Sequence, residues 1–485
     1  MHTPTGQTAC AAFRTAEVRP SIPPPHYDLL SPASILLLWR SAGLGRELHH
    51  GSELMSDQSD SRTALGSARR TFLRQATSAT AVVAATNVLT TSVHGESQAP
   101  APGRGGGAID LTEAGGLQAA LDALPKHGGT IFIPAGKHRI DRPVAKKLME
   151  GQHLSIVGEG RGSVLVNTNT AGEPLLQITG VVGSWWPDLR MTIRDLTFEG
   201  NHRSGDGLVV MFPNDTLVDT CFFLSHGGHA IRLAPQGTNV TVRDCWMRDC
   251  KRGVRAEGIH HLTLHGNQTR RLNGGQEQGE HVYLGWSCRE IRVVNNHFAY
   301  GDNTAIILDG TAQHVIANNT IEGFRISIEA RGVDAKKPRD HCRDIAITSN
   351  YLHSDIGVRL TGPCRGFAIT GNNFINNTEA AVLIEQAEGA GKHAITGNMI
   401  RKSVYDGALF PVPKMLPVQG GILLGGAGDC IVSNNLLDAI DPGPAISVGP
   451  GGGRHVITGN RIVGAKGEPL AIRAPGCVVE HNLIA

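Results

Sequence analysis

An asparagine recurs once every 22 to 37 residues through the C-terminal half of this 485-residue chain. A repeat of this length is one supersecondary unit, and units that recur many times stack on one another as a solenoid. Cys221 and Cys245 take the asparagine position further upstream, so the repeat has about eleven units. The repeating asparagines are Asn267, Asn296, Asn319, Asn350, Asn372, Asn398, Asn435, Asn460 and Asn482.

The residues around each asparagine indicate which solenoid forms. The chain is apolar three positions before it and nearly always apolar two positions after it, as in Ile369, Asn372 and Phe374. Short Val/Ile-rich runs with period-two alternation are typical of strands. The position directly before the asparagine is usually Gly, Asn or Ser, which suits a left-handed backbone conformation. The asparagine can then bond the turn and the asparagines stacked above and below it.

We therefore predict an all-β fold, a right-handed parallel β-helix solenoid of about eleven or more coils. A leucine-rich-repeat horseshoe is the alternative, but the fixed leucine frame of that fold is missing. Cys221 and Cys245 would be stacked about 4.8 Å apart, within the range for a disulfide. Stacked side chains point the same way, however, so we expect buried free thiols.

A second strand later in each coil supplies the candidate functional face. We expect these strands at residues 230–233, 253–256, 281–284, 305–308, 357–360, 381–384 and 421–424. Because side chains alternate across a strand, the residues beside the inward Ile, Val and Leu face solvent. One outward column is then Arg232, Arg255, Tyr283, Ile307, Ser327, Arg359 and Leu383, and the next is Ala234, Glu257, Gly285, Asp309, Glu329, Thr361 and Glu385.

Asp309 and Glu329 are expected on adjacent coils, with backbones about 4.8 Å apart. Two carboxylates this close cannot both ionise freely, so either one pKa rises or a cation joins them. The first outcome suits a retaining glycosidase, whose carboxyls lie about 5–5.5 Å apart. The second suits a calcium-assisted lyase, in which the metal neutralises the substrate carboxylate and an arginine removes the neighbouring proton. Calcium is implied only in the second case.

The same face carries the other candidate residues. Arg359 and Arg331 are the candidate bases for elimination, and Trp286 offers a ring on which a sugar can stack. The alternative is a solvated face held by salt bridges between neighbours. The candidate catalytic residues are Asp309, Glu329, Arg359, His281 and Tyr283, and the candidate substrate-binding residues are Glu257, Arg255, Arg331 and Trp286.

The residues before about position 108 do not follow the repeat. Residues 68–74 resemble the twin-arginine export motif around Arg69 and Arg70, and an uncharged Ala/Val/Thr-rich stretch follows at residues 76–93. That stretch is too short and too weakly apolar for a stable membrane span. We expect translation to begin at Met55, with residues 1–54 a misassigned extension, although a genuine extension is the alternative. Residues 55–108 are then a twin-arginine signal peptide with its linker, and residues 109–485 form the β-helix domain.

Composition agrees with an exported protein that is periplasmic or extracellular. The 61 glycines fit many tight turns, and a net charge of +2 gives no electrostatic basis for binding nucleic acid or a membrane.

The beginning of the predicted domain resembles a known family. Residues 109–112 read Ile-Asp-Leu-Thr, residues 128–136 read Gly-Gly-Thr-Ile-Phe-Ile-Pro-Ala-Gly, and residues 156–160 read Ile-Val-Gly-Glu-Gly. Between the first two lies an amphipathic helical pattern at residues 116–125. Together these resemble the opening segment of the pectate-lyase-like superfamily. The resemblance implies a capping helix over the N-terminal coil, and a polysaccharide groove walled by long loops, here expected at residues 270–279, 331–341 and 403–419.

The motifs of individual activities in that superfamily do not match. His226-Gly-Gly-His229 lacks the other segments of polygalacturonases, and the Asp-Pro-His of mannuronan epimerases is absent. We expect His226 and His229 to be turn residues, and Trp185 and Trp186 to pack over an early coil. The resulting hypothesis is an exported protein that acts on an acidic polysaccharide by β-elimination or hydrolysis. A non-catalytic β-helix that binds glycan or belongs to the cell envelope is the alternative.

Overall fold

The computed structural model describes residues 107–184, 186–271, 279–333, 337, 341–385, 390–401, 420–440 and 443–485. The export motif, the expected start at Met55 and most residues of the three expected long loops lie outside these ranges. None of the helices in the described part of the chain has the length and apolarity to span a bilayer.

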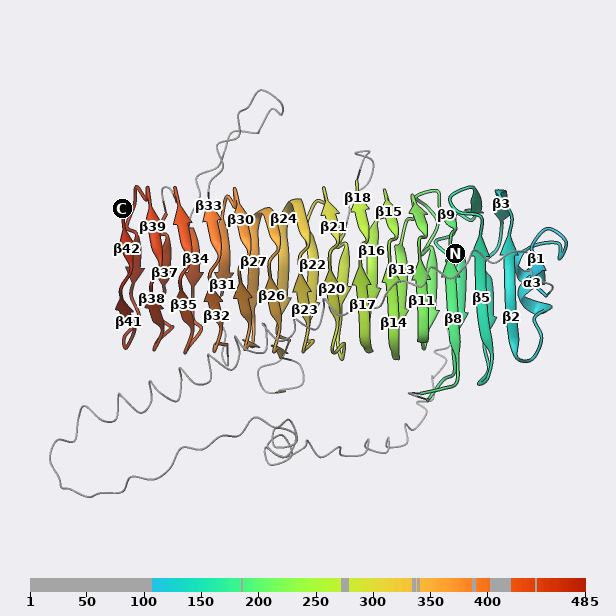
Figure 1. The fold of residues 1–485 in the computed structure, drawn as a ribbon, viewed down its shortest axis with the longest axis horizontal. Helices are drawn as coiled ribbons and strands as arrows, with labels where there is room; N and C mark the ends of the chain where they lie inside the picture. The colour runs from blue at the N-terminus through green and yellow to red at the C-terminus, as the bar shows by residue number, and fades with distance from the viewer. Residues whose placement is uncertain are drawn as a thin grey trace, which may run out of the picture. The chain divides into compact units, whose positions relative to one another are not determined.

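The described residues form a parallel β-solenoid, whose coils stack from β1 and α3 at one end to β42 at the other (Figure 1). The predicted β-helix is thus confirmed. Each coil has a first strand that ends before the asparagine, a short intermediate strand directly after it, and the second strand that carries the candidate face. The intermediate strand was not predicted as a separate element.

The first strands form a 15-stranded sheet, in which each strand pairs in parallel with the corresponding strand of the next coil. They are β1 (Ile109–Asp110), β2 (Gly128–Ile133), β5 (His153–Gly158), β8 (Arg190–Arg194), β11 (Asn214–Asp219), β14 (Gly237–Arg243), β17 (Ile259–His265), β20 (Arg292–Val294), β23 (Val315–Ala317), β26 (Ala346–Thr348), β29 (Ala368–Thr370), β32 (Ala394–Thr396), β35 (Ile431–Ser433), β38 (Val456–Thr458) and β41 (Val478–Glu480).

The second and intermediate strands form a 25-stranded sheet, because β24 (Thr320–Arg331) and β27 (Tyr351–Thr361) run through both positions. The other second strands are β4 (Val144–Lys147), β7 (Leu176–Thr179), β10 (Leu208–Met211), β13 (His229–Ala234), β16 (Arg252–Ala256), β19 (Val282–Leu284), β22 (Thr304–Asp309), β31 (Ala380–Ile384), β34 (Gly420–Leu424), β37 (Ile446–Val448) and β40 (Leu470–Ile472). The other intermediate strands are β3 (Gly136–Ile140), β6 (Ser163–Asn167), β9 (Thr197–Glu199), β12 (Phe222–Leu224), β15 (Trp246–Arg248), β18 (Gln268–Arg270), β21 (His297–Ala299), β30 (Asn373–Ile375), β33 (Met399–Arg401), β36 (Leu436–Asp438), β39 (Arg461–Val463) and β42 (Leu483–Ile484). Two further strands, β25 (Cys342–Arg343) and β28 (Cys364–Arg365), pair with each other.

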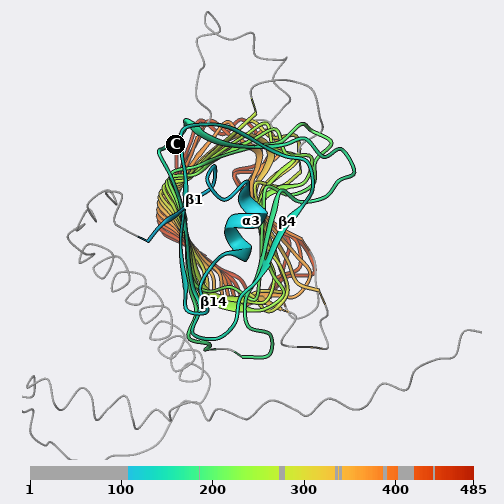
Figure 2. The ribbon, with the colours of Figure 1, turned by 90° about the vertical axis from the view of Figure 1, so that its right-hand side faces the viewer.

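The expected helix is α3 (Leu117–Asp122), which buries Leu117, Ala120 and Leu121 against the first coil. Viewed along the solenoid axis, α3 lies over the open end of the coils (Figure 2). Gln118 bonds the backbone of Ala145 in both directions, at 3.1 and 3.0 Å. This helix therefore covers apolar surface and strand ends that no preceding coil protects.

The predicted asparagine ladder is confirmed. In each of the nine repeats except the last, the side-chain amide nitrogen donates to the amide oxygen of the next asparagine at 2.8–3.0 Å. The second amide hydrogen goes to a backbone carbonyl of the preceding coil, as from Asn372 to Ile347 at 2.9 Å. The same amide oxygen also accepts the backbone N–H of the preceding asparagine, as Asn398 does from Asn372 at 2.9 Å. Each buried amide is thus fully bonded.

The residue before each asparagine adopts the expected left-handed conformation, with φ of 56–67° from Gly266 to His481. The ladder starts at Cys245, whose backbone N–H donates to Asn267 at 3.1 Å. The thiol of Cys245 points to the Val218 carbonyl at 3.7 Å, as an amide would. Cys221 and Cys245 are buried and free, as predicted.

Another corner of the coil uses histidine in a similar way. His314, His393 and His455 each follow a residue with positive φ, and each accepts a backbone N–H of the preceding coil on Nδ1 at 3.2 Å. All three are buried, so they are packing residues of the turn and do not face solvent. Burial lowers the pKa of His314 and of His393 to about 3.

We predict that replacing Asn372 or Asn398 with Leu destabilises the solenoid by about 1–3 kcal/mol, because backbone groups in a buried turn lose their partners. Chemical denaturation followed by circular dichroism measures the change. Asn373→Leu is the matched control, because the side-chain oxygen of Asn373 has no partner among the described residues. Unchanged unfolding midpoints for both ladder variants would rule out a stabilising ladder.

A second prediction concerns pH. His226, His281, His314 and His393 are fully buried, and burial lowers their pKa values to about 4, 3, 3 and 3. In the unfolded chain the pKa of histidine is about 6.5, so below this pH the unfolded state binds more protons. The contribution of these histidines to the free energy of unfolding is therefore fully present above about pH 6.5 and is lost as the pH falls towards 4. The free energy of unfolding changes by up to about 1.4 kcal/mol per pH unit for each histidine.

Urea denaturation at several pH values tests this expectation, with His393→Asn as the variant that lacks one of the four buried imidazoles. Its stability should depend less steeply on pH between 6.5 and 4. A slope equal to that of the parent protein would contradict the assignment.

Candidate functional site

The second strands place one column of side chains on the outer face of the 25-stranded sheet. Strand register aligns Arg232, Arg255, Tyr283, Ile307, Glu329, Arg359 and Leu383 on successive coils. This column agrees with the expected one except at the coil of β24, where Glu329 stands in place of Ser327. Ser327 is instead fully buried, and its hydroxyl bonds that of Ser354 at 2.7 Å.

The predicted pairing of Asp309 with Glu329 is therefore wrong. Asp309 stands opposite Arg331, and Glu329 stands two residues away, opposite Ile307. The reason is that the inward positions of β24 at this height are Ile328 and Ala330, both fully buried. The sequence alignment took Ile326 and Ile328 as these positions, because a single inward alanine gives little apolar signal.

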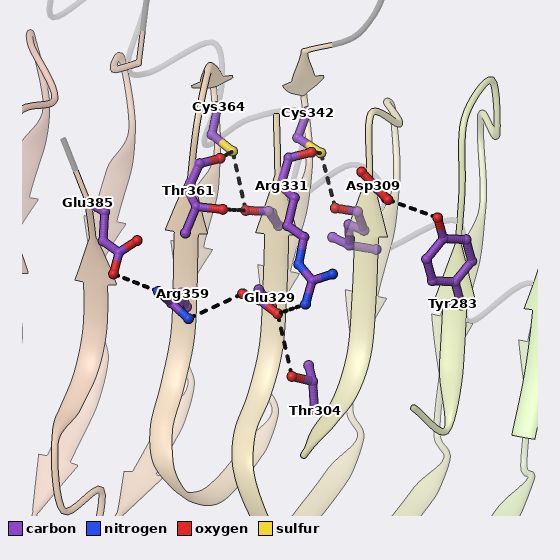
Figure 3. A network of polar contacts seen from close by, with 12 residues as sticks. Tyr283, Thr304, Asp309, Glu329, Arg331, Cys342, Arg359, Thr361, Cys364 and Glu385 are labelled. Atoms are coloured by element: carbon purple, nitrogen blue, oxygen red, sulfur yellow. Dashed lines mark hydrogen bonds and ion pairs between the residues drawn. The ribbon is translucent and has the colours of Figure 1, made fainter. Parts of the chain in front are cut away.

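Glu329 is the centre of a charge network rather than one of a pair of carboxylates (Figure 3). Its side chain is only 5% exposed, and it accepts from Arg331 at 2.5 Å and from Arg359 at 3.4 Å. The Thr304 hydroxyl also donates to it, at 3.4 Å. Arg359 reaches Glu385 on the following coil at 2.8 Å. Two guanidinium groups therefore neutralise Glu329.

The state of Arg331 bears on its expected role as a base. Burial lowers the pKa of Arg331, but its hydrogen bond and charge interaction with Glu329 outweigh this, so that the pKa is raised. A guanidinium that holds its proton this firmly does not abstract another one.

A second group of residues surrounds Tyr283. Its hydroxyl donates to Asp309 at 2.8 Å, and the guanidinium of Arg255 lies 4.3 Å from the centre of its ring. Arg255 in turn bonds Glu257 at 2.7 Å. Burial, followed by the hydrogen bond to Asp309, raises the pKa of Tyr283 well above its usual value. The phenol therefore stays protonated at neutral pH and serves as a hydrogen-bond donor, not as a base.

Gly285 stands in the row of side chains between Glu257 and Asp309, and the Tyr283 ring lies over it. It follows β19, and its neighbours in register on the adjacent coils are Glu257 and Asp309, as the pairings of Leu284 with Ala256 and Leu308 indicate. A Cβ at this position would lie 2.6 Å from a ring carbon of Tyr283 and 3.1 Å from Cγ of Glu257. The Tyr283 ring thus occupies the position between Glu257 and Asp309, and glycine is required beneath it. Trp286, the next residue, is 67% exposed.

His281 was expected on the outer face, but it lies inside the wall of the solenoid. It is 4% exposed, its Nδ1 contacts the Thr269 hydroxyl, and its ring packs edge-on against Phe324 with centroids 4.8 Å apart. Burial lowers its pKa to about 3. This histidine fills the corner between the intermediate and second strands and cannot contact a substrate.

The sequence analysis missed a group further towards the N-terminus on the same sheet. His229 Nδ1 lies 3.0 Å from Asp206, and the other oxygen of Asp206 lies 2.8 Å from Nε of Arg232. Burial raises the pKa of Asp206, but its interactions with His229 outweigh this and lower it. Asp206 stands two positions before the inward Leu208, and His229 stands two positions before the inward Ile231, with which Leu208 pairs. This equal spacing is the sequence signal from which the contact between Asp206 and His229 could have been predicted. His226 is a buried turn residue, as expected, and bonds the Phe198 carbonyl at 3.0 Å. The same expectation is wrong for His229, which is the first residue of β13 and pairs with Arg252.

The candidate site offers no ready place for calcium. Within the described ranges, no group of three or more His, Cys, Asp and Glu side chains is placed to hold a metal ion. The oxygens of Glu329 are directed to arginines, and an oxygen of Asp309 is directed to Tyr283. A calcium ion bridging Asp309 and Glu329 does not fit these contacts.

Comparison with known proteins is consistent with the fold. Residues 191–388 match the family described as "Periplasmic copper-binding protein (NosD)". Mannuronan C5-epimerase AlgE2 of Azotobacter vinelandii is 27% identical over 162 residues, which are 30% of this chain and 16% of that protein. Mannuronan C5-epimerase AlgE4 of the same organism is 27% identical over 150 residues, which are 27% of each protein. The chain thus spans less than a third of the length of these relatives.

Two solved structures are similar to the β-helix. The A-module of mannuronan C-5 epimerase AlgE6 from Azotobacter vinelandii has a TM-score of 0.50 and 16% identity, covering 78% of this chain and 99% of the module. DFA-IIIase from Arthrobacter chlorophenolicus A6 has a TM-score of 0.50 and 15% identity, covering 73% of this chain and 94% of that one. At these identities the likeness shows the parallel β-helix fold.

We predict that Glu329→Gln lowers stability by roughly 1–3 kcal/mol, because it removes the charge that Arg331 and Arg359 share in a buried position. Thermal unfolding of the variant measures this. Glu385→Gln, which removes an exposed partner of Arg359, is the matched control and should cost at most about 1 kcal/mol. Equal unfolding midpoints for Glu329→Gln and the parent would show that the network is not structural.

Proposed function

We propose that the chain is a carbohydrate-active β-helix protein that hydrolyses glycosidic bonds of an acidic polysaccharide on the outer face of its second strands. The observation that carries this proposal is the pair of carboxylates, Glu257 and Asp309, which stand two coils apart with the Tyr283 ring between them. A sugar ring stacked on the outer side of Tyr283 would have a carboxyl group on each side and an exposed tryptophan, Trp286, nearby.

The spacing of the two carboxyls suits hydrolysis with inversion. Adjacent strands lie about 4.8 Å apart, so side chains two coils apart start about 9.6 Å apart. Inverting glycosidases hold their two carboxyls about 6.5–9.5 Å apart, which leaves room for a water molecule. Tyr283 holds Asp309 in place through its hydroxyl, 2.8 Å away, and Asp309 is assigned as the base that activates water. Glu257 is assigned as the acid that protonates the leaving oxygen.

β-Elimination has less support, because the face offers no suitable base for it. The raised pKa values of Arg331 and Tyr283 keep both groups protonated. Arg359 is engaged by two carboxylates, Glu329 and Glu385. The retaining mechanism that would need Asp309 and Glu329 in register is also disfavoured, because these residues are not paired.

The arginines of the face support an acidic substrate. Arg255, Arg331 and Arg359 are partly exposed, and each guanidinium has five N–H donors, more than its contacts with carboxylates use. The remaining donors suit the planar carboxylate of a uronic acid. Mannuronan C5-epimerases are among the relatives, and the polysaccharide in their name, mannuronan, is consistent with such a substrate.

The cellular location is part of the proposal. The twin-arginine motif at Arg69 and Arg70 and the periplasmic family matched by residues 191–388 favour export to the periplasm or beyond. Copper binding is not carried over from the family description, because the described residues do not assemble three ligands of a metal site.

The test is a screen of uronate polysaccharides with the full chain. We expect new reducing ends without unsaturated sugars, and NMR of the first product should show an inverted anomeric centre. Asp309→Asn and Glu257→Gln should each lower the rate roughly 10²–10⁴-fold while the unfolding midpoint changes little. Gly285→Ala should also lower the rate, because its Cβ collides with Tyr283 and displaces the phenol that holds Asp309.

Each contrary outcome has a defined meaning. Unsaturated products would overturn hydrolysis in favour of elimination, and a retained anomeric centre would overturn the role of the Glu257–Asp309 spacing. If no polysaccharide is cleaved although several bind, the non-catalytic glycan-binding alternative holds. Asp219→Asn is a suitable control, because Asp219 is a buried acid paired with Arg243 on the other sheet.

A further inference from the structure

A tryptophan that was expected to pack over an early coil is instead exposed beside a hollow on the other sheet. Trp186 precedes β8, and its side chain is 66% exposed. Its ring centroid lies 6.5 Å from that of His261 on β17. Since β11 and β14 separate β8 from β17 in the sheet, the two residues belong to coils about 14 Å apart along the axis. The segment that carries Trp186 therefore extends parallel to the solenoid axis, across neighbouring coils, and does not follow the path of its own coil.

The turn that presents Trp186 is fixed to the body of the solenoid. Asn214, which is buried, donates from its side chain to the Pro187 carbonyl at 2.9 Å. The Asp188 carbonyl accepts the backbone N–H of Gly151 at 2.7 Å. These contacts come directly after Trp186 in the chain, so the ring is held at the surface by its own backbone.

Next to Trp186 the outer face of the 15-stranded sheet is hollowed, with a volume of about 360 Å³. Thr263 and Val315 belong to strands β17 and β23, and His261, Glu290 and Gln313 form one edge. These three edge residues all have positive φ, of 53°, 55° and 64°. They are the corner residues of three successive coils.

Arg292 lies in this hollow and is exposed. Its side chain makes no ion pair or hydrogen bond with any residue in the described ranges, although many other surface arginines of the solenoid are paired. The nearby Glu290 is in contact with Nε2 of His261 instead. An exposed guanidinium in the hollow and an exposed indole at its His261 edge leave both a planar donor group and an apolar ring face available to a ligand.

We propose that this hollow is a second glycan-binding site, which holds a uronate-bearing oligosaccharide with one sugar stacked on Trp186 and a carboxylate bonded by Arg292. Tryptophan faces offer apolar area for the C–H face of a sugar, and arginine matches a carboxylate with two parallel N–H donors. The polar edge residues His261, Glu290 and Gln313 can bond hydroxyl groups. The volume is at the lower end of the range for ligand sites, which fits one or two sugar rings.

This site is separate from the proposed catalytic face, which lies on the outer surface of the other sheet. It shares with the proposed function only the class of ligand, and it requires no catalysis. A polysaccharide held at the hollow would stay close to the solenoid between cleavage events, which raises its effective concentration at the second strands.

The experiment is calorimetric titration of the full chain with tetrasaccharides of galacturonate and of mannuronate, in an Asp309→Asn background so that no ligand is consumed. We expect two sites in this parent. Trp186→Ala and Arg292→Gln should each weaken one of them roughly tenfold or more, so that the stoichiometry falls from two to one. With carboxyl-reduced tetrasaccharides, Arg292→Gln should have no further effect.

Trp246→Ala and Arg461→Gln are the matched controls. The Trp246 ring is covered by the Arg161 guanidinium at 4.7 Å, and Arg461 is an exposed arginine on β39. Both controls should keep two sites. Unchanged binding in Trp186→Ala and Arg292→Gln would overturn the proposal, while a parent with one site that Trp186→Ala removes would support the hollow and contradict binding at the catalytic face.

Discussion

The structure depends on coils that stack in strict register, and the asparagine ladder is the interaction that enforces it. Each amide bonds the next amide and the backbone of the preceding coil, so a coil displaced by one residue would leave several buried polar groups without partners. An unsatisfied buried group costs about 1–3 kcal/mol, and the ladder repeats this penalty in coil after coil. Left-handed corner residues make the arrangement possible, because they turn the chain sharply enough for the asparagine to point inward.

Register in the core fixes geometry on the surface. Because successive second strands stay in register, residues far apart in sequence come within contact distance, as Tyr283 and Asp309 do at 2.8 Å. The same regularity produces the charge row of Arg331, Glu329, Arg359 and Glu385, in which each charge contacts one of opposite sign. A site on such a face is built by the choice of residue at each coil, and it needs no loop to assemble it.

The sequence was sufficient to predict the ladder, the second strands and most of the outward column, because each rests on a strong repeating signal. The amphipathic pattern at residues 116–125 was sufficient for the capping helix. The placement of Glu329 failed for a local reason. In β24 the intermediate and second strands merge, with an irregularity between Glu322 and Phe324, and the inward residue Ala330 is too small to stand out. Because the predicted alignment was two residues out of register, Glu329 was expected opposite Asp309. In the structure it stands opposite Ile307 on one side and Arg359 on the other. His281 was misplaced for a similar reason, since alternation within a strand does not hold at the corner where the strand begins. The exposure of Trp186 could not be predicted, because it depends on a turn that follows the axis and breaks the repeat.

The corrected register changes which residues can do chemistry. Glu329 was attractive as a catalytic acid because it seemed to have a carboxylate neighbour, yet its neighbours are two guanidinium groups, and an acid so neutralised has little reason to hold or transfer a proton. Glu257 and Asp309 differ because each has one hydrogen-bonded partner among the described residues, Arg255 and the Tyr283 hydroxyl, and neither is enclosed between two guanidinium groups. A regular solenoid tends to fill every outward position, and neighbouring charges then neutralise one another. A carboxylate that keeps one side free of arginine is therefore the more informative feature of such a face, since a substrate can reach it there.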